Sequence, residues 1–274
     1  ILEIVVARTR DLAARTQQIL GIGAVLGSPF DLGLLAQVSG FKDSEILNAV
    51  EEARLMSLIE PTGEQKFTFV HDRVQEALLS QLSDSQRRQF HQAAAEILDR
   101  MDQDQLESQP ELIFARARHF ANGEGQSMER AFFSGKAAGL LAASNFANQE
   151  AYVFLTAALE AADKAGLPLD PELTFVLGEV SLHINKPDEA FHRLRQTLDL
   201  TDDPFKRAEV HHRLSRMYMS NFQAREAWVE INAGFQAIGL PTLEMNLFHW
   251  IRMVFLWLFT LTFPNSWFVR HRAR

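Results

Sequence analysis

The apolar and polar positions of this chain follow helical spacing over most of its length, with one short interval of strand-like alternation. Apolar residues recur at the spacing of a helix face in 13–25, 32–38 and 45–56, which predicts three helices. Alternating residues in 57–60 and 66–70 predict two strands, and the Pro-Thr-Gly-Glu between them has the Pro and Gly of a hairpin connection. The chain is therefore predicted to begin with three helices and a β-hairpin.

This order of elements is that of a winged helix, which we assign to residues 1–82. Helical patterns continue in 84–101 and 110–120, joined by an acidic, Gln-rich stretch. We interpret residues 83–126 as a helical linker.

Three copies of one helical spacing follow in residues 127–242, with small and large apolar residues at matching offsets. Their members are Gly139, Ala151, Leu155 and Ala158; then Leu177, Gly178, Ala190, Leu194 and Leu198; then Leu214, Tyr218, Ala227, Ile231 and Phe235. The alanines at 151, 190 and 227 are spaced slightly more widely than the roughly 34-residue period of a tetratricopeptide repeat (TPR), which the pattern resembles. The predicted fold class is all-α with a small β-wing: a winged helix followed by an α-α TPR-like solenoid.

Residues 243–274 are predicted to form an apolar helix with a basic tail at 270–274. Thirteen of the seventeen residues in 247–263 are apolar. Three interpretations stay open: a further repeat helix, an interfacial helix with Trp250 and Trp257 at the headgroup level, and a short membrane span.

Composition narrows the choice of partners and chemistry. The formal net charge of −8 and the acidic character of the candidate recognition helix at 43–56 argue against nucleic acid as a partner. The chain has no cysteine, which excludes disulfides and thiol nucleophiles and suits a reducing cytoplasm. It opens on Ile1 rather than Met and shows no signal peptide, so we expect a piece of a longer cytoplasmic polypeptide. Residues 247–274 are its candidate for peripheral contact with a membrane.

The junction between the second strand and the next helix is the best candidate for a functional site. Phe67 and Phe69 alternate with polar residues as in a half-buried strand, and Asp72 with Gln75 predicts an N-cap and a reciprocal capping box. His71 then lies just before a helix N-terminus, where backbone N–H groups favour anions.

Residues 67–77 resemble the end of the winged-helix domain in STAND-class signalling ATPases, bacterial regulators in which helical repeats follow an ATPase module. Looser similarity extends to 4–8, 16–20, 30–32, 35–40, 87–91 and 118–120. Val70-His71-Asp72 is similar to the Met-His-Asp signature of this class, whose histidine contacts the β-phosphate of ADP. The resemblance implies that His71 senses nucleotide while Asp72 orders the helix start; the alternative is that His71 only packs and Asp72 only caps.

No catalytic motif supports an enzyme in this segment. No Gly-x-x-x-x-Gly-Lys-Ser/Thr loop occurs, and we expect Gly135-Lys136 to be an ordinary helix position. The nine histidines show no i, i+4 pair, so we expect no metal site. Acidic pairs such as Glu51-Glu52 are expected on solvated surface.

The sequence therefore predicts a non-catalytic regulatory and interaction region of a multidomain signal-transduction ATPase. A protein or peptide would bind the concave face of the TPR solenoid and be coupled through the winged helix to the ATPase module of the same chain. No cofactor is expected in the segment itself, whereas the resemblance implies ATP or ADP with Mg²⁺ for the parent chain, and a kinase or cyclase elsewhere in it. The alternative is a free-standing TPR adaptor or scaffold, membrane-associated through 247–263.

Overall fold

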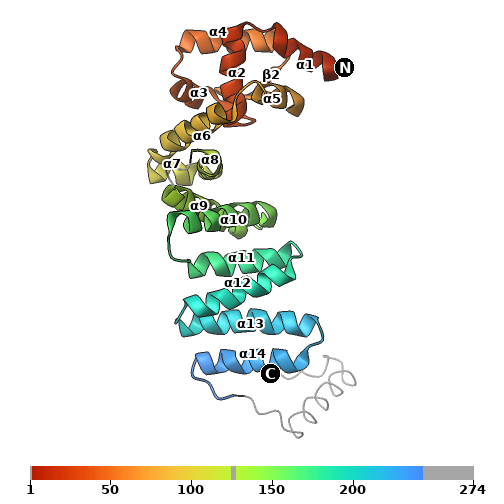
Figure 1. Cartoon of the computed structure of the whole chain (residues 1–274), viewed down its shortest axis with the longest axis vertical. Coiled ribbons are helices and arrows are strands. Elements are labelled where there is room, and N and C mark those ends of the chain that lie inside the picture. Colours follow the sequence, from red (N-terminus) through yellow and green to blue (C-terminus); the bar gives the residue numbers. More distant parts are fainter. Residues whose placement is uncertain (1, 125–127, 243–274) are drawn as a thin grey trace, which may run out of the picture. The chain divides into compact units, whose positions relative to one another are not determined.

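The computed structural model describes residues 2–124 and 128–242. This part of the chain forms fourteen α-helices and one three-stranded antiparallel sheet (Figure 1), so the fold is mainly helical with a small β-wing, as predicted. The elements up to the end of the β-wing are α1 (Leu2–Asp11), α2 (Ala14–Leu26), β1 (Phe30–Asp31), α3 (Leu32–Ser39), α4 (Asp43–Leu55), β2 (Ile59–Gly63) and β3 (Lys66–Phe69). The helices that follow are α5 (Asp72–Leu79), α6 (Asp84–Asp99), α7 (Gln103–Ser108), α8 (Pro110–Asn122), α9 (Met128–Ser144), α10 (Asn148–Ala165), α11 (Pro171–His183), α12 (Pro187–Leu200), α13 (Pro204–Ser220) and α14 (Ala224–Ala237).

The elements from α2 to β3 have the order of a winged helix, and the sheet order is β1-β3-β2. Phe30 in β1 pairs with Phe67 in β3, and its ring lies 5.2 Å from that of Phe69 between centroids. Phe69 is buried, whereas Lys66, Phe67 and Thr68 are all half-buried, so the strand is where it was predicted but the predicted alternation of burial is not seen. The two-residue strand β1 was not predicted because two residues are too short to show an alternating pattern.

The predicted hairpin connection is wrong by a few residues. Strand β2 continues through Pro61 and Gly63, and the turn lies at Glu64 and Gln65. Pro61 is tolerated inside a strand because β2 is at the edge of the sheet, where a missing N–H leaves no partner strand unpaired. Gln65 takes the left-handed conformation the turn requires, with φ of 58°.

One side chain expected on the solvated surface has a structural role. Glu52 of α4 accepts hydrogen bonds from the backbone N–H of Ala13, at 2.9 Å, and from the hydroxyl of Thr16. A carboxylate thus satisfies the N-terminus of α2, where unpaired N–H groups and the positive end of the helix dipole lie. Its neighbour Glu51 lies on the surface as expected, paired with Arg54 at 3.1 Å.

The linker holds one helix more than predicted. Helix α7 lies in the Gln-rich stretch between α6 and α8, and Asp102 caps it by accepting the N–H of Gln105 at 2.8 Å. Leu106 is buried, with 2% of its surface exposed. A six-residue helix with a single buried apolar residue shows no apolar period, which explains why the pattern did not predict it.

The three predicted repeats are helical hairpins: α9 with α10, α11 with α12, and α13 with α14 (Figure 1). In the first two, a glycine lets the paired helices approach. A Cβ added to Gly139 would lie 2.5 Å from Cγ of Leu155, and one added to Gly178 would lie 3.0 Å from Cγ of Leu194. Ser215 takes the corresponding place in the third hairpin and is buried. The repeat pattern is therefore a packing pattern, as predicted.

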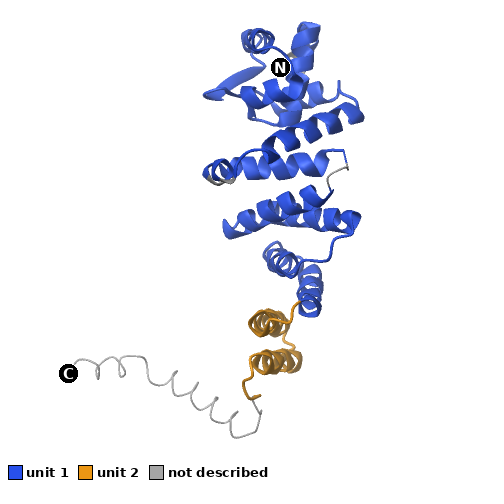
Figure 2. Cartoon of the chain, turned by 90° about the vertical axis from the view of Figure 1, so that its left-hand side faces the viewer, with its two compact units in different colours: residues 1–200 blue, residues 201–274 orange. Residues whose placement is uncertain are grey.

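The chain divides into two compact units, residues 1–200 and 201–274 (Figure 2). The first holds the elements α1 to α8, which include the predicted winged helix and linker, and the first two hairpins; the second holds the third hairpin. The domain boundaries predicted after residues 82, 126 and 242 stay predictions. Residues 243–274 lie outside the described part of the chain, and so do the three interpretations of 247–263. Among the helices of residues 2–124 and 128–242, none combines the length and apolar character needed to cross a membrane.

The turn inside each hairpin has the same geometry in all three copies. Phe146, Asn185 and Phe222 occupy the left-handed region with φ of 60°, 61° and 59°. In each case the following N–H bonds to the carbonyl five residues earlier, as from Ala147 to Ala142 at 2.9 Å. The two phenylalanine rings are 87% and 97% exposed. Residues other than Gly, Asn and Asp are strained in this region because Cβ lies too close to the following carbonyl oxygen, so both turns store backbone strain without burying a ring.

Replacing Phe146 or Phe222 by Asn is therefore expected to stabilise the protein. Asn already occupies this place at Asn185, and each substitution should raise the free energy of unfolding by about 0.5–1 kcal/mol. Urea unfolding followed by circular dichroism measures the change. The reciprocal control, Asn185→Phe, should lower stability by a similar amount, and a loss of stability in Phe146→Asn would contradict the strain.

Candidate functional site

His71 and Asp72 lie at the exposed N-terminus of α5, directly after β3. His71 occupies the N-cap position in an extended conformation, and Asp72 is the first residue of the helix. The predicted capping box is wrong: no side chain caps α5, and Gln75 instead donates from Nε2 to the carbonyl of Ala24 at the end of α2, at 2.9 Å. The amide of Gln75 satisfies a carbonyl near a helix C-terminus, where backbone acceptors lack intrahelical partners.

Both side chains of the predicted site are free to contact another molecule. His71 and Asp72 are exposed, and among the described residues neither side chain forms a hydrogen bond or an ion pair. The imidazole and the first N–H groups of α5 suit a phosphate oxygen, whereas the Asp72 carboxylate repels one. His71 is therefore the candidate phosphate contact. A nucleotide would have to be held mainly by residues outside this chain, since the sequence has no P-loop.

A second cluster joins α2 to α6 and α8. Arg118 of α8 donates from its guanidinium to the carbonyl of Leu26, at the end of α2, at 3.3 Å. Next to it, Nδ1 of His119 lies 2.8 Å from Nδ1 of His91 on α6, so one imidazole donates a hydrogen bond to the other. His119 is fully buried and His91 half-buried. The cluster thus links α2, α6 and α8.

The two histidines are neutral at physiological pH. Burial, reinforced by the charge of Arg118, lowers the pKa of His91 to about 4. Burial, His91 and Arg118 together lower the pKa of His119 to about 3. Burial also lowers the pKa of the Arg118 guanidinium. The sequence resemblance extends over Arg118 and His119 but implies no role for them. Their contact with His91 could not be predicted, because only the folded chain brings α6 beside α8.

The Gly135-Lys136 pair is a helix position, as expected. Lys136 lies on α9 and forms ion pairs with Asp170 at 2.7 Å and Glu172 at 2.9 Å, both at the start of α11. Burial would lower the pKa of Lys136, but hydrogen bonds to the two carboxylates outweigh it and raise that pKa. The same pairing lowers the pKa of Asp170 against the effect of its burial. Lys136 therefore fastens the first hairpin to the second.

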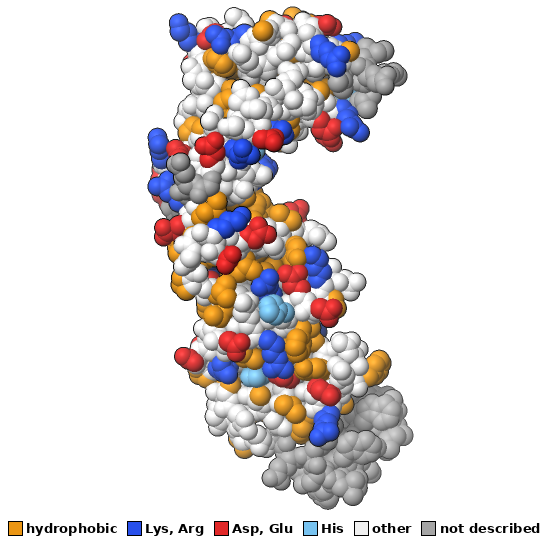
Figure 3. Space-filling view, in the orientation of Figure 1, with side chains coloured by type: hydrophobic (Ala, Val, Ile, Leu, Met, Phe, Trp, Pro, Cys, Tyr) orange, Lys and Arg blue, Asp and Glu red, His pale blue; other side chains and the backbone are white. Residues whose placement is uncertain are grey.

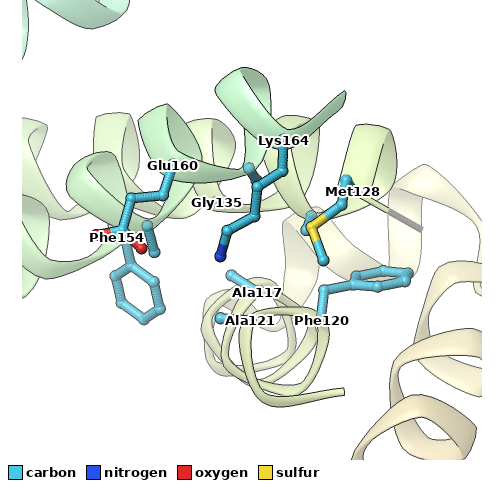
Figure 4. A pocket seen from close by; sticks show the side chains of 11 residues that line it. Ala117, Phe120, Ala121, Met128, Gly135, Phe154, Glu160 and Lys164 are labelled. Atoms are coloured by element: carbon cyan, nitrogen blue, oxygen red, sulfur yellow. The ribbon is translucent and has the colours of Figure 1, made fainter. Parts of the chain in front are cut away.

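A cavity of about 70 Å³ lies between α8, α9 and α10 (Figure 4). Small side chains make most of its wall, with larger apolar ones at the sides. The lining consists of Ala117, Phe120, Ala121, Met128, Ala131, Gly135, Phe154, Ala157, Glu160, Ala161 and Lys164. Glu160 and Lys164 are its only charged members and come from successive turns of α10. Figure 4 shows Lys164 pointing toward α8, while Glu160 extends beside Phe154.

A second cavity, of about 160 Å³, lies between α13 and α14 and is lined by Ile231, Phe235 and Ile238 among others. Glu230 reaches its wall but is buried and bonded to Nδ1 of His211 at 2.8 Å, whereas His212 faces outward. The two adjacent histidines thus point to different sides of α13. No group of three potential metal-ligating side chains occurs in the part of the chain that the structure describes.

On the face shown in Figure 3, acidic and basic side chains are interspersed over the described helices, with apolar side chains between them. The expectation that nucleic acid is not a partner stays a prediction.

Comparison with known proteins finds similarity at the level of structure. No family model matches the chain, and no curated protein matches it. Among solved structures, it is similar to the Signal Transduction ATPase with Numerous Domains (STAND) protein with a tetratricopeptide repeat sensor from Pyrococcus horikoshii, with 15% sequence identity and a TM-score of 0.43. The similarity covers 84% of this chain and 33% of that one, so the chain spans about a third of the length of the solved structure.

Proposed function

We propose that this chain is a regulatory and interaction region of a STAND-type signalling ATPase and is not itself an enzyme. Its helical hairpins bind a protein or peptide. The winged helix passes that event to the ATPase module of the same polypeptide, where His71 contacts the nucleotide phosphate. ATP or ADP and Mg²⁺ belong to that module.

The observation that carries this proposal is the exposed, unpartnered His71 at the start of α5, within the Val-His-Asp sequence that resembles the sensing motif of this class. The packing supports it. Gln75, one turn along α5, holds the end of α2, and Arg118 of the linker bonds to the same end at Leu26. A displacement of α5 would therefore move α2, to which α8 is also bonded. This gives a physical route by which movement of the winged helix is coupled to the linker.

The test is His71→Ala in the full-length protein. Because the His71 side chain is exposed and forms no hydrogen bond or ion pair with other described residues, its loss should leave the free energy of unfolding within about 0.5 kcal/mol of wild type. Loss of a charge-assisted hydrogen bond to phosphate should weaken ADP retention by roughly tenfold, or about 1.5 kcal/mol. Nucleotide-dependent activity should change with it.

The matched control is His192→Ala, an exposed histidine on α12. It should leave both ADP retention and activity unchanged. A His71→Ala protein that retains ADP as wild type does would rule out the sensing role. If the gene sequence upstream of Ile1 encoded no P-loop, the free-standing adaptor would replace this proposal.

A further inference from the structure

We propose that the cavity between α8, α9 and α10 binds a small apolar amino acid as its zwitterion. The side chain enters the cavity, the α-ammonium group contacts Glu160, and the α-carboxylate contacts Lys164. This site is separate from the nucleotide contact at His71, which does not line the cavity.

The size and lining of the cavity indicate which amino-acid side chain the ligand carries. Apart from Glu160 and Lys164, every lining residue is apolar, with Phe120 and Phe154 at the sides. An apolar cavity of about 150 Å³ holds a benzene molecule. The volume of about 70 Å³ therefore suits a branched side chain of three or four carbons, such as that of valine or leucine.

The two charged residues at the rim of the cavity, Glu160 and Lys164, indicate which polar groups the ligand carries. Glu160 and Lys164 are four residues apart on α10, so their Cβ atoms are neighbours on one helix face. They do not pair with each other, and neither forms a hydrogen bond or ion pair with any other residue in the described ranges. Two unpaired charges of opposite sign beside one apolar cavity match the ammonium and carboxylate of a zwitterion. A hydrocarbon, or a side chain within a peptide, would leave both rim charges unused.

The wall of the cavity consists partly of residues that pack α8, α9 and α10 against one another. A Cβ added to Gly135 in its wall would lie 3.1 Å from the Cβ of Ala158, so this glycine sets the closeness of α9 to α10. Ala161 and Phe120 in the wall are buried, with 6% and 5% of their surfaces exposed. A ligand there would contact three helices at once and stabilise their arrangement.

Isothermal titration calorimetry on the full chain tests the proposal, with L-valine and L-leucine at concentrations up to about 10 mM, tenfold above a Kd of about 1 mM. N-acetyl-L-valine, which lacks the ammonium, and L-valinamide, which lacks the carboxylate, should each bind at least tenfold more weakly than L-valine. Glu160→Gln should abolish the preference over N-acetyl-L-valine, and Lys164→Gln the preference over L-valinamide. Ala121→Leu, which fills the cavity from α8, should abolish binding.

Asp163→Asn is the matched control, because Asp163 is an exposed carboxylate between the two rim residues that does not line the cavity. It should bind L-valine as wild type does. No binding of either amino acid, or binding unchanged in the rim and cavity variants, would overturn the proposal. So would equal binding of N-acetyl-L-valinamide, which would mark a pocket for a partner's side chain. None of these results depends on ADP retention, so this proposal and the nucleotide-sensing role can fail separately.

Discussion

Replacing Gly139 by Ala is expected to lower the free energy of unfolding by about 2 kcal/mol. The added Cβ would lie 2.5 Å from Cγ and 3.1 Å from the backbone nitrogen of Leu155, a fully buried residue on the paired helix. Overpacking of this kind costs about 1–3 kcal/mol, and the nearby backbone prevents relief by a simple rotamer change. The cost exceeds the gain of up to about 1 kcal/mol that Ala brings to a helix interior. Urea unfolding at neutral pH measures the difference.

Gly21→Ala is the matched control for this substitution. Gly21 is also helical and buried, but an added Cβ would meet the side chain of Leu82 at 3.6 Å, an ordinary contact. The same chemical change should there be neutral or stabilise by up to about 1 kcal/mol. Equal effects of the two substitutions would show that helix propensity, and not the approach of α9 to α10, determines the cost at Gly139.

Mild acid is expected to destabilise the protein through the buried His91–His119 pair. Both pKa values are lower in the folded protein, about 4 and about 3, than the 6.5 of an ordinary histidine. The unfolded chain therefore binds more protons below pH 6.5, and stability is lost as the pH falls from 6.5 toward 4. At pH 5 the fully buried His119 alone should cost about 2 kcal/mol, with a smaller loss from the half-buried His91.

The geometry of the pair explains why it resists protonation. The two Nδ1 atoms are 2.8 Å apart, so only one of them can carry a proton toward the other. The first proton added to the pair creates a positive charge beside Arg118. A second proton would place an Nδ1–H group of each ring facing the other. Nε2 of His119 is buried without a partner among the described residues, so it cannot take the proton cheaply.

Urea unfolding at pH 7, 6 and 5 measures the acid effect. The double variant His91→Asn/His119→Asn keeps polar atoms near both Nδ1 positions but does not titrate, so its stability should fall at least about 2 kcal/mol less than that of wild type between pH 7 and pH 5. His183→Asn, at an exposed site, should leave the pH dependence as in wild type. A double variant with the wild-type pH dependence would exclude the pair as its source.

The candidate site was only partly predictable. The sequence predicted that His71 stands before a helix, because a strand pattern gives way there to a helical one. It predicted the wrong partner for Gln75, since a capping box is a local rule and the carbonyl of Ala24 lies 51 residues away. The cavity at Glu160 and Lys164 gave no sequence signal: small residues on α8, α9 and α10 serve helix packing equally well.

The sequence by itself determined the helical class, the β-wing and the three repeated hairpins. These depend on local periodicity and on small residues such as Gly139 and Gly178, whose spacing is visible along the chain. Only the tertiary structure decided that Glu52 accepts the Ala13 N–H at the start of α2 across 39 residues and that His91 contacts His119 across 28. Polar contacts between elements follow no period, because each depends on where two packed helices bring single side chains together.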